Sequence, residues 1–132
     1  HSLAAGDHGT TYGGNPLACA AVCKVIELFE KQNVLDNVRK VGDYLGQRLD
    51  ELTAEFDCIE VRRGIGMMQG LVFDRPVGDM IVKAMDKGLV LINAGSNIIR
   101  FVPSLVITRE NVDDMITILR ESIQEVCRNA QA

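Results

Sequence analysis

The spacing of apolar residues predicts two long helices in the first half of the chain. Between residues 16 and 32 apolar side chains lie almost all round the helix, so this helix is expected to be buried or closely packed on several sides. From residue 34 to residue 56 apolar positions recur every three or four residues and charged residues fill the other face, which is typical of an amphipathic helix. Asn15 and Pro16 supply an N-cap and a first helical residue, and Asn33 separates the helices.

The period changes from helical to alternating after the second helix. Residues 58–62 alternate between apolar and polar, and residues 67–73 form a second strand. Three glycines at positions 64, 66 and 70 lie in this segment. Their spacing does not suit a dinucleotide fingerprint, and a strand follows where a helix is needed, so we interpret them as hairpin and bulge glycines.

A short helix, two more strands and a closing helix are predicted for the remainder. They are a helix opened by Pro76 and ended by Lys87 and Gly88, strands over 89–93 and 97–102, and a helix capped by Thr108. The whole set predicts an α+β fold, with helices packed on a mostly antiparallel sheet.

Composition narrows the possible partners and the compartment. The chain has 132 residues, enough for one domain with a core, and its net charge of −4 argues against a nucleic acid or an anionic membrane as partner. No apolar run approaches the roughly 20 residues of a membrane span. Cys19 and Cys23 match no zinc motif, and we expect them to be buried free thiols in a reducing cytoplasm. The abrupt beginning His1-Ser2-Leu3 suggests a piece of a longer protein.

The candidate chemistry begins in the loop from Gly6 to Ala18. Its glycines allow a close backbone approach, Thr10 and Thr11 offer hydroxyl donors, and a helix begins directly after it. These features fit an anion-binding loop. A tight turn before a capped helix is the alternative, and composition alone favours that alternative.

The same loop, GDHGTTYGGNPLA, resembles a signature of the class III, pyridoxal-phosphate-dependent aminotransferases, most closely their acetylornithine and ornithine branch. RGIGMMQG and KGLVLINAGSNIIRFVPSLVI resemble two further segments of that family, so the similarity covers nearly all of this chain but only the last third of a family member. The resemblance implies that residues 1–15 are an active-site loop remnant of a truncated large domain. Residues 16–132 would then be the C-terminal small domain of a fold-type I aminotransferase, with its long entry helices.

The resemblance also assigns roles to three residues. Thr11 would bind the phosphate of pyridoxal phosphate across a homodimer interface, Thr10 would lie near the substrate, and Arg100 would hold the α-carboxylate of the substrate. From the residues alone, the favoured interpretation of Arg100 is an edge-strand arginine whose stem packs while its head reaches water. The five lysines lie on predicted helices, and none stands in the family's Schiff-base lysine context, so no catalytic residue and no metal ligand is assigned.

The implied parent is a cytoplasmic homodimer with small-molecule amino-acid substrates. It would move the terminal amino group of N-acetylornithine to 2-oxoglutarate, a step of arginine biosynthesis. We expect the fragment alone to be inactive and to hold no cofactor. Ornithine, succinylornithine or aminobutyrate as the amino donor, and a free-standing α+β interaction module, remain alternatives.

Overall fold

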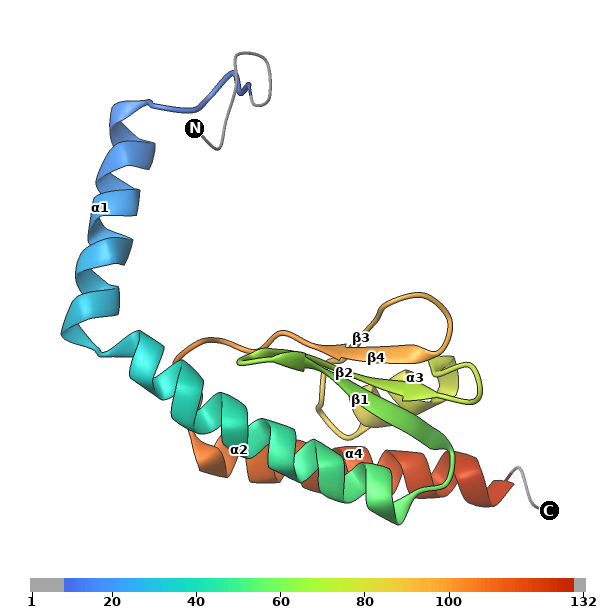
Figure 1. Ribbon diagram of the computed structural model, residues 1–132. Coiled ribbons are helices and arrows are strands. Elements are labelled where there is room, and N and C mark those ends of the chain that lie inside the picture. Colours follow the sequence, from blue (N-terminus) through green and yellow to red (C-terminus); the bar gives the residue numbers. More distant parts are fainter. Residues whose placement is uncertain (1–8, 130–132) are drawn as a thin grey trace. The chain divides into compact units, whose positions relative to one another are not determined.

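The computed structural model describes residues 9–129, which fold into four helices and four strands (Figure 1). In chain order they are α1 (Pro16–Lys31), α2 (Val34–Glu55), β1 (Ile59–Ile65), β2 (Met68–Phe73), α3 (Gly78–Asp86), β3 (Ile92–Asn93), β4 (Ile98–Phe101) and α4 (Arg109–Asn129). The chain divides into two compact units, one ending at Val34 and the other beginning at Leu35. Each unit is described by itself. Among the described residues no helix is both long enough and apolar enough to cross a membrane.

Helix α1 begins and ends where the sequence predicts. The Asn15 side chain accepts a hydrogen bond from the backbone N–H of Ala18 at 3.0 Å, and Pro16 occupies the first helical position. These two residues satisfy one free N–H group and remove another, which fixes the helix start. After Lys31 the backbone of Asn33 turns left-handed, with φ of 49°, and the helix cannot continue.

The predicted burial of α1 is wrong for this chain. None of its residues is buried, and Leu17 is 80% exposed. Cys19 and Cys23 are exposed as well, so the expectation of two buried thiols is also wrong. The all-round apolar pattern is real, but the unit that ends at Val34 does not bury it.

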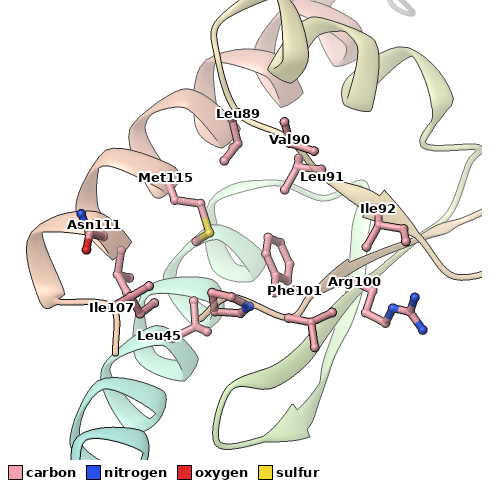
Figure 2. A pocket seen from close by; sticks show the side chains of 13 residues that line it. Leu45, Leu89, Val90, Leu91, Ile92, Arg100, Phe101, Ile107, Asn111 and Met115 are labelled. Carbon is pink, nitrogen blue, oxygen red and sulfur yellow. The ribbon is translucent and has the colours of Figure 1, made fainter. Parts of the chain in front are cut away.

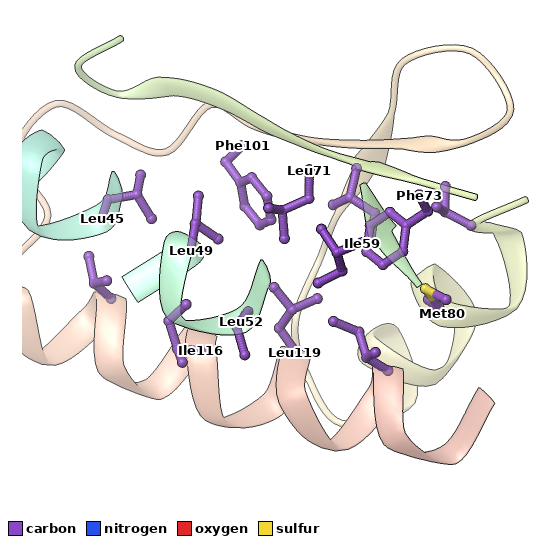
Figure 3. Packing of buried hydrophobic residues seen from close by; sticks show 14 of the residues in the cluster. Leu45, Leu49, Leu52, Ile59, Leu71, Phe73, Met80, Phe101, Ile116 and Leu119 are labelled. Carbon is purple, nitrogen blue, oxygen red and sulfur yellow. The ribbon is translucent and has the colours of Figure 1, made fainter. Parts of the chain in front are cut away.

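The second unit is a two-layer α+β fold, as predicted. Its sheet has the strand order β1-β2-β4-β3, and every neighbouring pair is antiparallel. Helices α2 and α4 cover one face of this sheet (Figure 1). Their leucines and isoleucines meet sheet side chains such as Phe101 and Leu71, which makes a dry core (Figure 3). The Tyr44 hydroxyl donates to Asp113 at 2.7 Å and links α2 to α4 at the edge of that core.

A glycine lies in the turn of the β1–β2 hairpin, but none lies at the bulge of β1. Ile65 pairs with Met68, so Gly66 and one further residue form a two-residue turn, and Gly66 has a positive φ of 57°. The register instead shifts between Ile59 and Val61, at the other end of β1. The bulge expected at a glycine is therefore at Glu60, where no glycine marks it.

Strand β3 is shorter than predicted, because Leu89, the first residue of the predicted strand, bonds instead to the end of α3. The N–H of Gly88, whose φ is 88°, donates to Met85, and the N–H of Leu89 donates back to Ala84 at 2.8 Å. This pair of bonds is a Schellman motif, which satisfies the last carbonyls of α3. Leu89 thus belongs to the helix stop, and only Ile92 and Asn93 pair as a strand.

The closing helix α4 begins with the cap that the sequence predicts. The Thr108 hydroxyl accepts from the N–H of Asn111 at 3.4 Å, and the Asn111 side chain accepts from the N–H of Thr108 at 3.0 Å. Asn111 takes the place that glutamate holds in a capping box. The apolar stripe of α4 faces the core, with Val112, Ile116, Leu119 and Ile123 fully buried.

Candidate functional site

Arg100 lies on the open face of the sheet. Along β4 the neighbouring residues Ile99 and Phe101 are buried in the core, whereas Arg100 is exposed and shares the opposite face with Ile98 and Val102. The edge-strand position expected for Arg100 is wrong, because β4 lies between β2 and β3. No described residue forms a hydrogen bond or an ion pair with the Arg100 guanidinium. Its five N–H donors remain available to a ligand.

The pairing of the strands places a second arginine in line with Arg100. Arg63 on β1 is opposite Gly70 on β2, and Gly70 is opposite Arg100 on β4. Directly opposed residues share a face, and each step across the sheet is about 4.5–5.5 Å, so the two arginine Cα atoms are about 10 Å apart. Because Gly70 has no side chain, the space between the two arginines is not filled from β2.

Arg63 and Arg100 differ from the other arginines whose side chains the structure describes. Each of the others has a carboxylate or aromatic partner, in the pairs Arg39–Asp36, Arg48–Glu51, Arg62–Asp50, Arg75–Asp74, Arg120–Glu55 and Arg109 over the Tyr44 ring. Arg63 is exposed and, like Arg100, has none among the described residues. Two unneutralised cations on one face of a rigid sheet favour an anionic ligand. Sequence reasoning missed Arg63, although counting back from the Gly66 turn would have paired it with Gly70.

A buried amide fixes this part of the sheet against α2. The Gln69 side chain donates to the carbonyls of Gly42 and Gly66, both at 2.8 Å, and accepts from Arg62 at 3.2 Å. Arg62 in turn holds Asp50 through two hydrogen bonds, of 2.7 and 3.1 Å. Gly42 is needed here because a Cβ atom on it would come within 2.8 Å of the Gly66 backbone. The hairpin that carries Arg63 and Gly70 is therefore anchored at its turn.

Replacing Gln69 by Leu should lower the free energy of unfolding of the chain by about 1–3 kcal/mol, because the buried Gly42 carbonyl and the partly buried Gly66 carbonyl lose their donor. Urea unfolding followed by circular dichroism measures this difference. Gln47→Leu is the matched control. Gln47 is exposed on α2, the helix that Gln69 contacts through Gly42, and its replacement should change the free energy of unfolding by less than about 0.5 kcal/mol. Equal effects from the two substitutions would contradict the anchoring role of Gln69.

An apolar hollow lies beside Arg100, but the guanidinium does not enter it. The hollow has a volume of about 320 Å³ and is lined by aliphatic and aromatic side chains from α2, α4, β4 and the segment before β3. Figure 2 shows Met115, Phe101 and Leu89 around it, with the Arg100 side chain directed away from them. Asn111 lines the hollow from α4, and Arg100 lines it without directing its guanidinium into it. The Arg100 guanidinium is therefore available on the open sheet face and not inside this hollow.

Thr10 and Thr11 lie in the first unit, in the loop before α1. The Thr10 hydroxyl accepts from the N–H of Tyr12 at 3.3 Å, while the Thr11 hydroxyl bonds to none of the described residues and is exposed. The Asn15 amide donates to the carbonyl of Tyr12, which holds the loop on the side of the threonines that leads into α1. An exposed hydroxyl on a fixed loop just before a helix N-terminus fits a phosphate group. The structure describes these threonines and Arg100 in separate units.

The five lysines are helical or at a helix end, and four of them are already paired with carboxylates. Lys24 and Lys31 bond to Glu27, Lys83 is near Glu125, and Lys87 bonds to Glu121 and Glu125. The hydrogen bonds that Lys87 donates to Glu121 and Glu125 raise the pKa of Lys87. A raised pKa keeps the amine protonated, which is the opposite of what a Schiff-base lysine needs. His8 precedes Thr10 and Thr11 in the loop and could in principle exchange a proton, but it lies outside the described residues.

Comparison with known proteins identifies the family. The family model described as aminotransferase class-III matches residues 1–123. The acetylornithine aminotransferase of Gloeobacter violaceus is 44% identical over 116 residues, which are 86% of this chain and 29% of that protein. A [LysW]-aminoadipate semialdehyde/glutamate semialdehyde transaminase of Sulfolobus acidocaldarius is 36% identical over 126 residues, 96% of this chain and 33% of that protein.

A solved structure agrees with these sequence matches. The acetylornithine aminotransferase of Elizabethkingia anophelis superposes with a TM-score of 0.81 at 28% identity, covering 93% of this chain and 33% of that one. The chain thus spans about a third of the length of the relatives it matches. The predicted family and α+β fold are both confirmed. This chain belongs to the class-III aminotransferase family.

Proposed function

We propose that this chain is the C-terminal part of an acetylornithine aminotransferase. Such an enzyme transfers the terminal amino group of N-acetylornithine to 2-oxoglutarate and yields N-acetylglutamate semialdehyde and glutamate. The observation that carries the proposal is Arg100, which is exposed on the open sheet face and has no partner among the described residues, in a chain that matches acetylornithine aminotransferases along most of its length. Both amino donors, N-acetylornithine and glutamate, carry the α-carboxylate that this arginine would bind.

Arg100 would bind and orient the substrate. A guanidinium presents parallel N–H donors that match the two oxygens of a carboxylate, and β4 is fixed between two neighbouring strands. A carboxylate held in two places cannot rotate, so the rest of the substrate is aimed in one direction. Arg63 would add a second positive charge to the same face and raise the local concentration of anionic substrates.

Thr11 would hold the phosphate of pyridoxal phosphate, with Thr10 near the substrate. When bound, this cofactor supplies the carbonyl that takes up the amino group and the electron sink that makes the transfer possible. We propose that Thr11 acts across the interface of a homodimer, on the cofactor of the neighbouring subunit. The exposed apolar side chains of α1, which follow the loop directly, support a covering surface outside this chain.

The remaining parts of the catalytic site are proposed to lie upstream of His1. They are the Schiff-base lysine, the acid beside the pyridine nitrogen and the main phosphate loop. We therefore propose that residues 1–15 complete the large-domain site, that residues 16–132 form the small domain, and that the isolated chain is inactive. The cytoplasm remains our proposed location, which agrees with the four free cysteines of the chain.

The donor assignment is tested by the full-length enzyme. We expect kcat/KM for N-acetylornithine to exceed the values for ornithine, succinylornithine and aminobutyrate, each measured with 2-oxoglutarate as acceptor. A higher value for any of the other donors would transfer the assignment to that donor. The relative from Sulfolobus acidocaldarius, which is named for other semialdehydes, shows why this measurement is needed.

Replacing Thr11 by Val in the full-length enzyme should weaken the binding of pyridoxal phosphate. A hydroxyl that donates to a charged group contributes about 1.5–3 kcal/mol, so we expect the dissociation constant to rise roughly 10- to 150-fold. Titration of the cofactor-free enzyme, followed by cofactor absorbance, gives this constant. Thr117→Val is the control, because the Thr117 hydroxyl bonds within α4 to the Asp113 carbonyl and should not affect the cofactor. An unchanged constant for Thr11→Val would favour the simple turn before a capped helix.

A further inference from the structure

Two cysteines far apart in the sequence meet at one end of the second unit. Cys58 immediately precedes β1, and Cys127 lies near the end of α4. Their Sγ atoms are 2.8 Å apart although the residues are 69 positions apart in the chain. Cys58 is buried at 6% exposure, Cys127 is partly exposed, and both are free thiols. Nothing in the transfer of an amino group uses this pair.

The backbone on both sides of the contact is held in place. The carbonyl of Cys58 accepts from the N–H of Asp74 at 3.1 Å, which ties it to the end of β2. On the other side, Ile123 is fully buried one turn before Cys127 and fixes that part of α4. To become bonded at about 2.0 Å, the two sulfurs would have to move by less than about 1 Å. The folded chain thus presents the two thiols already aligned.

We propose that Cys58 and Cys127 form a site of reversible covalent modification, at which peroxide converts the two thiols into a disulfide. Cys127, the more exposed thiol, attacks one oxygen of hydrogen peroxide as its thiolate. The O–O bond breaks, a sulfenic acid forms and the first water leaves. Cys58 then attacks that sulfur, the S–S bond forms, the S–O bond breaks and the second water leaves. The two thiols lose two electrons and two protons, and the peroxide takes them up.

The surroundings of Cys58 make it the second thiol to react. Burial, followed by the hydrogen bond with Cys127, raises the pKa of Cys58 to about 12. A thiol with so high a pKa is a poor first nucleophile at neutral pH, because little thiolate is present. It is still placed against the sulfur that it must attack. We therefore expect formation of the bond to be slow with dilute peroxide but specific to this pair.

The bond would close a ring that contains the whole sheet. All four strands, α3 and nearly all of α4 lie between residues 58 and 127. A cross-link over so long a segment restricts the unfolded chain strongly, so oxidation stabilises the second unit. It leaves Arg100 and the loop of Thr11 chemically unchanged.

Peptide mapping of the full-length enzyme tests the proposal. The enzyme is treated with hydrogen peroxide, remaining thiols are blocked with N-ethylmaleimide, and trypsin is added without reductant. Cleavage after Arg48 and Arg62 releases Cys58 on one peptide, and cleavage after Arg120 and Arg128 releases Cys127 on another. We expect these peptides to appear joined, about 2 Da lighter than the sum of their masses, and to separate after dithiothreitol.

Variants and an unfolded control complete the test. Cys58→Ala and Cys127→Ser should each abolish the joined peptide, whereas the double variant Cys19→Ser/Cys23→Ser should retain it. In urea the same treatment should give mixed pairings, because the alignment is lost. Recovery of the two peptides separately blocked after peroxide would overturn the proposal, as would a bond from either cysteine to any other cysteine of the folded enzyme.

Discussion

Replacing Arg100 by Lys in the full-length enzyme is expected to lower kcat/KM by roughly 30- to several-thousand-fold, nearly as much as replacing it by Ala. The loss of a desolvated, hydrogen-bonded charge partner costs on the order of 2–5 kcal/mol. Lysine keeps the positive charge, but its ammonium group is a compact point charge. It lacks the parallel N–H donors with which a planar guanidinium binds both oxygens of a carboxylate. The loss should appear with N-acetylornithine and with glutamate, since each presents an α-carboxylate.

A structural role for Arg100 predicts the opposite pattern, with a lower melting temperature and unchanged kinetics per folded molecule. Both quantities should therefore be measured on the same preparations. Arg39→Lys is the matched control, because Arg39 is exposed on α2 and paired with Asp36, away from the sheet face. Near-normal kcat/KM for both donors with Arg100→Lys would end the assignment of Arg100 to the carboxylate.

Replacing Gly64 by Ala is expected to destabilise the second unit by about 3 kcal/mol or more. Gly64 has a φ of 118°, which an L side chain rarely adopts. A Cβ atom there would also overlap the carbonyl oxygen of Met68 and come within 2.6 Å of the Gln69 Cα. These neighbours are backbone atoms of the paired strand, so the overlap can be relieved only by opening the hairpin.

Chemical unfolding of the chain measures the effect of Gly64→Ala. Gly78→Ala supplies the control, because Gly78 is the first residue of α3 and a Cβ atom on it would contact nothing within 4 Å. That substitution should be neutral or stabilising by up to about 1 kcal/mol, since alanine favours the helix and restricts the unfolded chain. A loss below about 1 kcal/mol for Gly64→Ala would mean that the hairpin accommodates a side chain.

Local signals predicted the starts of α1 and α4 and the end of α3. The predicted start of α3 at Pro76 is wrong, because the helix begins at Gly78, and the other misses depend on contacts between distant residues. Asn15 and Thr108 bond to the first turns of their own helices, so the residues that carry the information are neighbours in the sequence. The exposure of α1 could not be read in this way, because apolar residues indicate that a surface is suited to burial but not that this chain supplies the cover. The start of β3 was also misplaced, since Leu89 fits a strand by composition yet completes the stop of α3.

In the candidate site, too, features that depend on sequence neighbours could be predicted and features that depend on strand pairing could not. Adjacent residues of a strand point to opposite faces, so the face that Arg100 shares with Ile98 and Val102 follows from the order of residues in β4 alone. The position of Arg63 beside Arg100 depends on β2 pairing with β1 and β4 at once, and the sequence order does not reveal that β4, and not β3, is the second neighbour of β2. The roles of Thr10, Thr11 and Arg100 toward ligands stay predictions.

The order of the strands also sets the order in which the sheet can assemble. The β1–β2 hairpin joins residues that begin only three positions apart, at Ile65 and Met68, whereas β2 and β4 join residues such as Val72 and Ile98 across the whole of α3. Short loops close faster than long ones, so we expect the hairpin to form first and β4 to dock later. Arg63 would then be in place early during synthesis, and Arg100 would reach its position beside Gly70 only when most of this unit has left the ribosome.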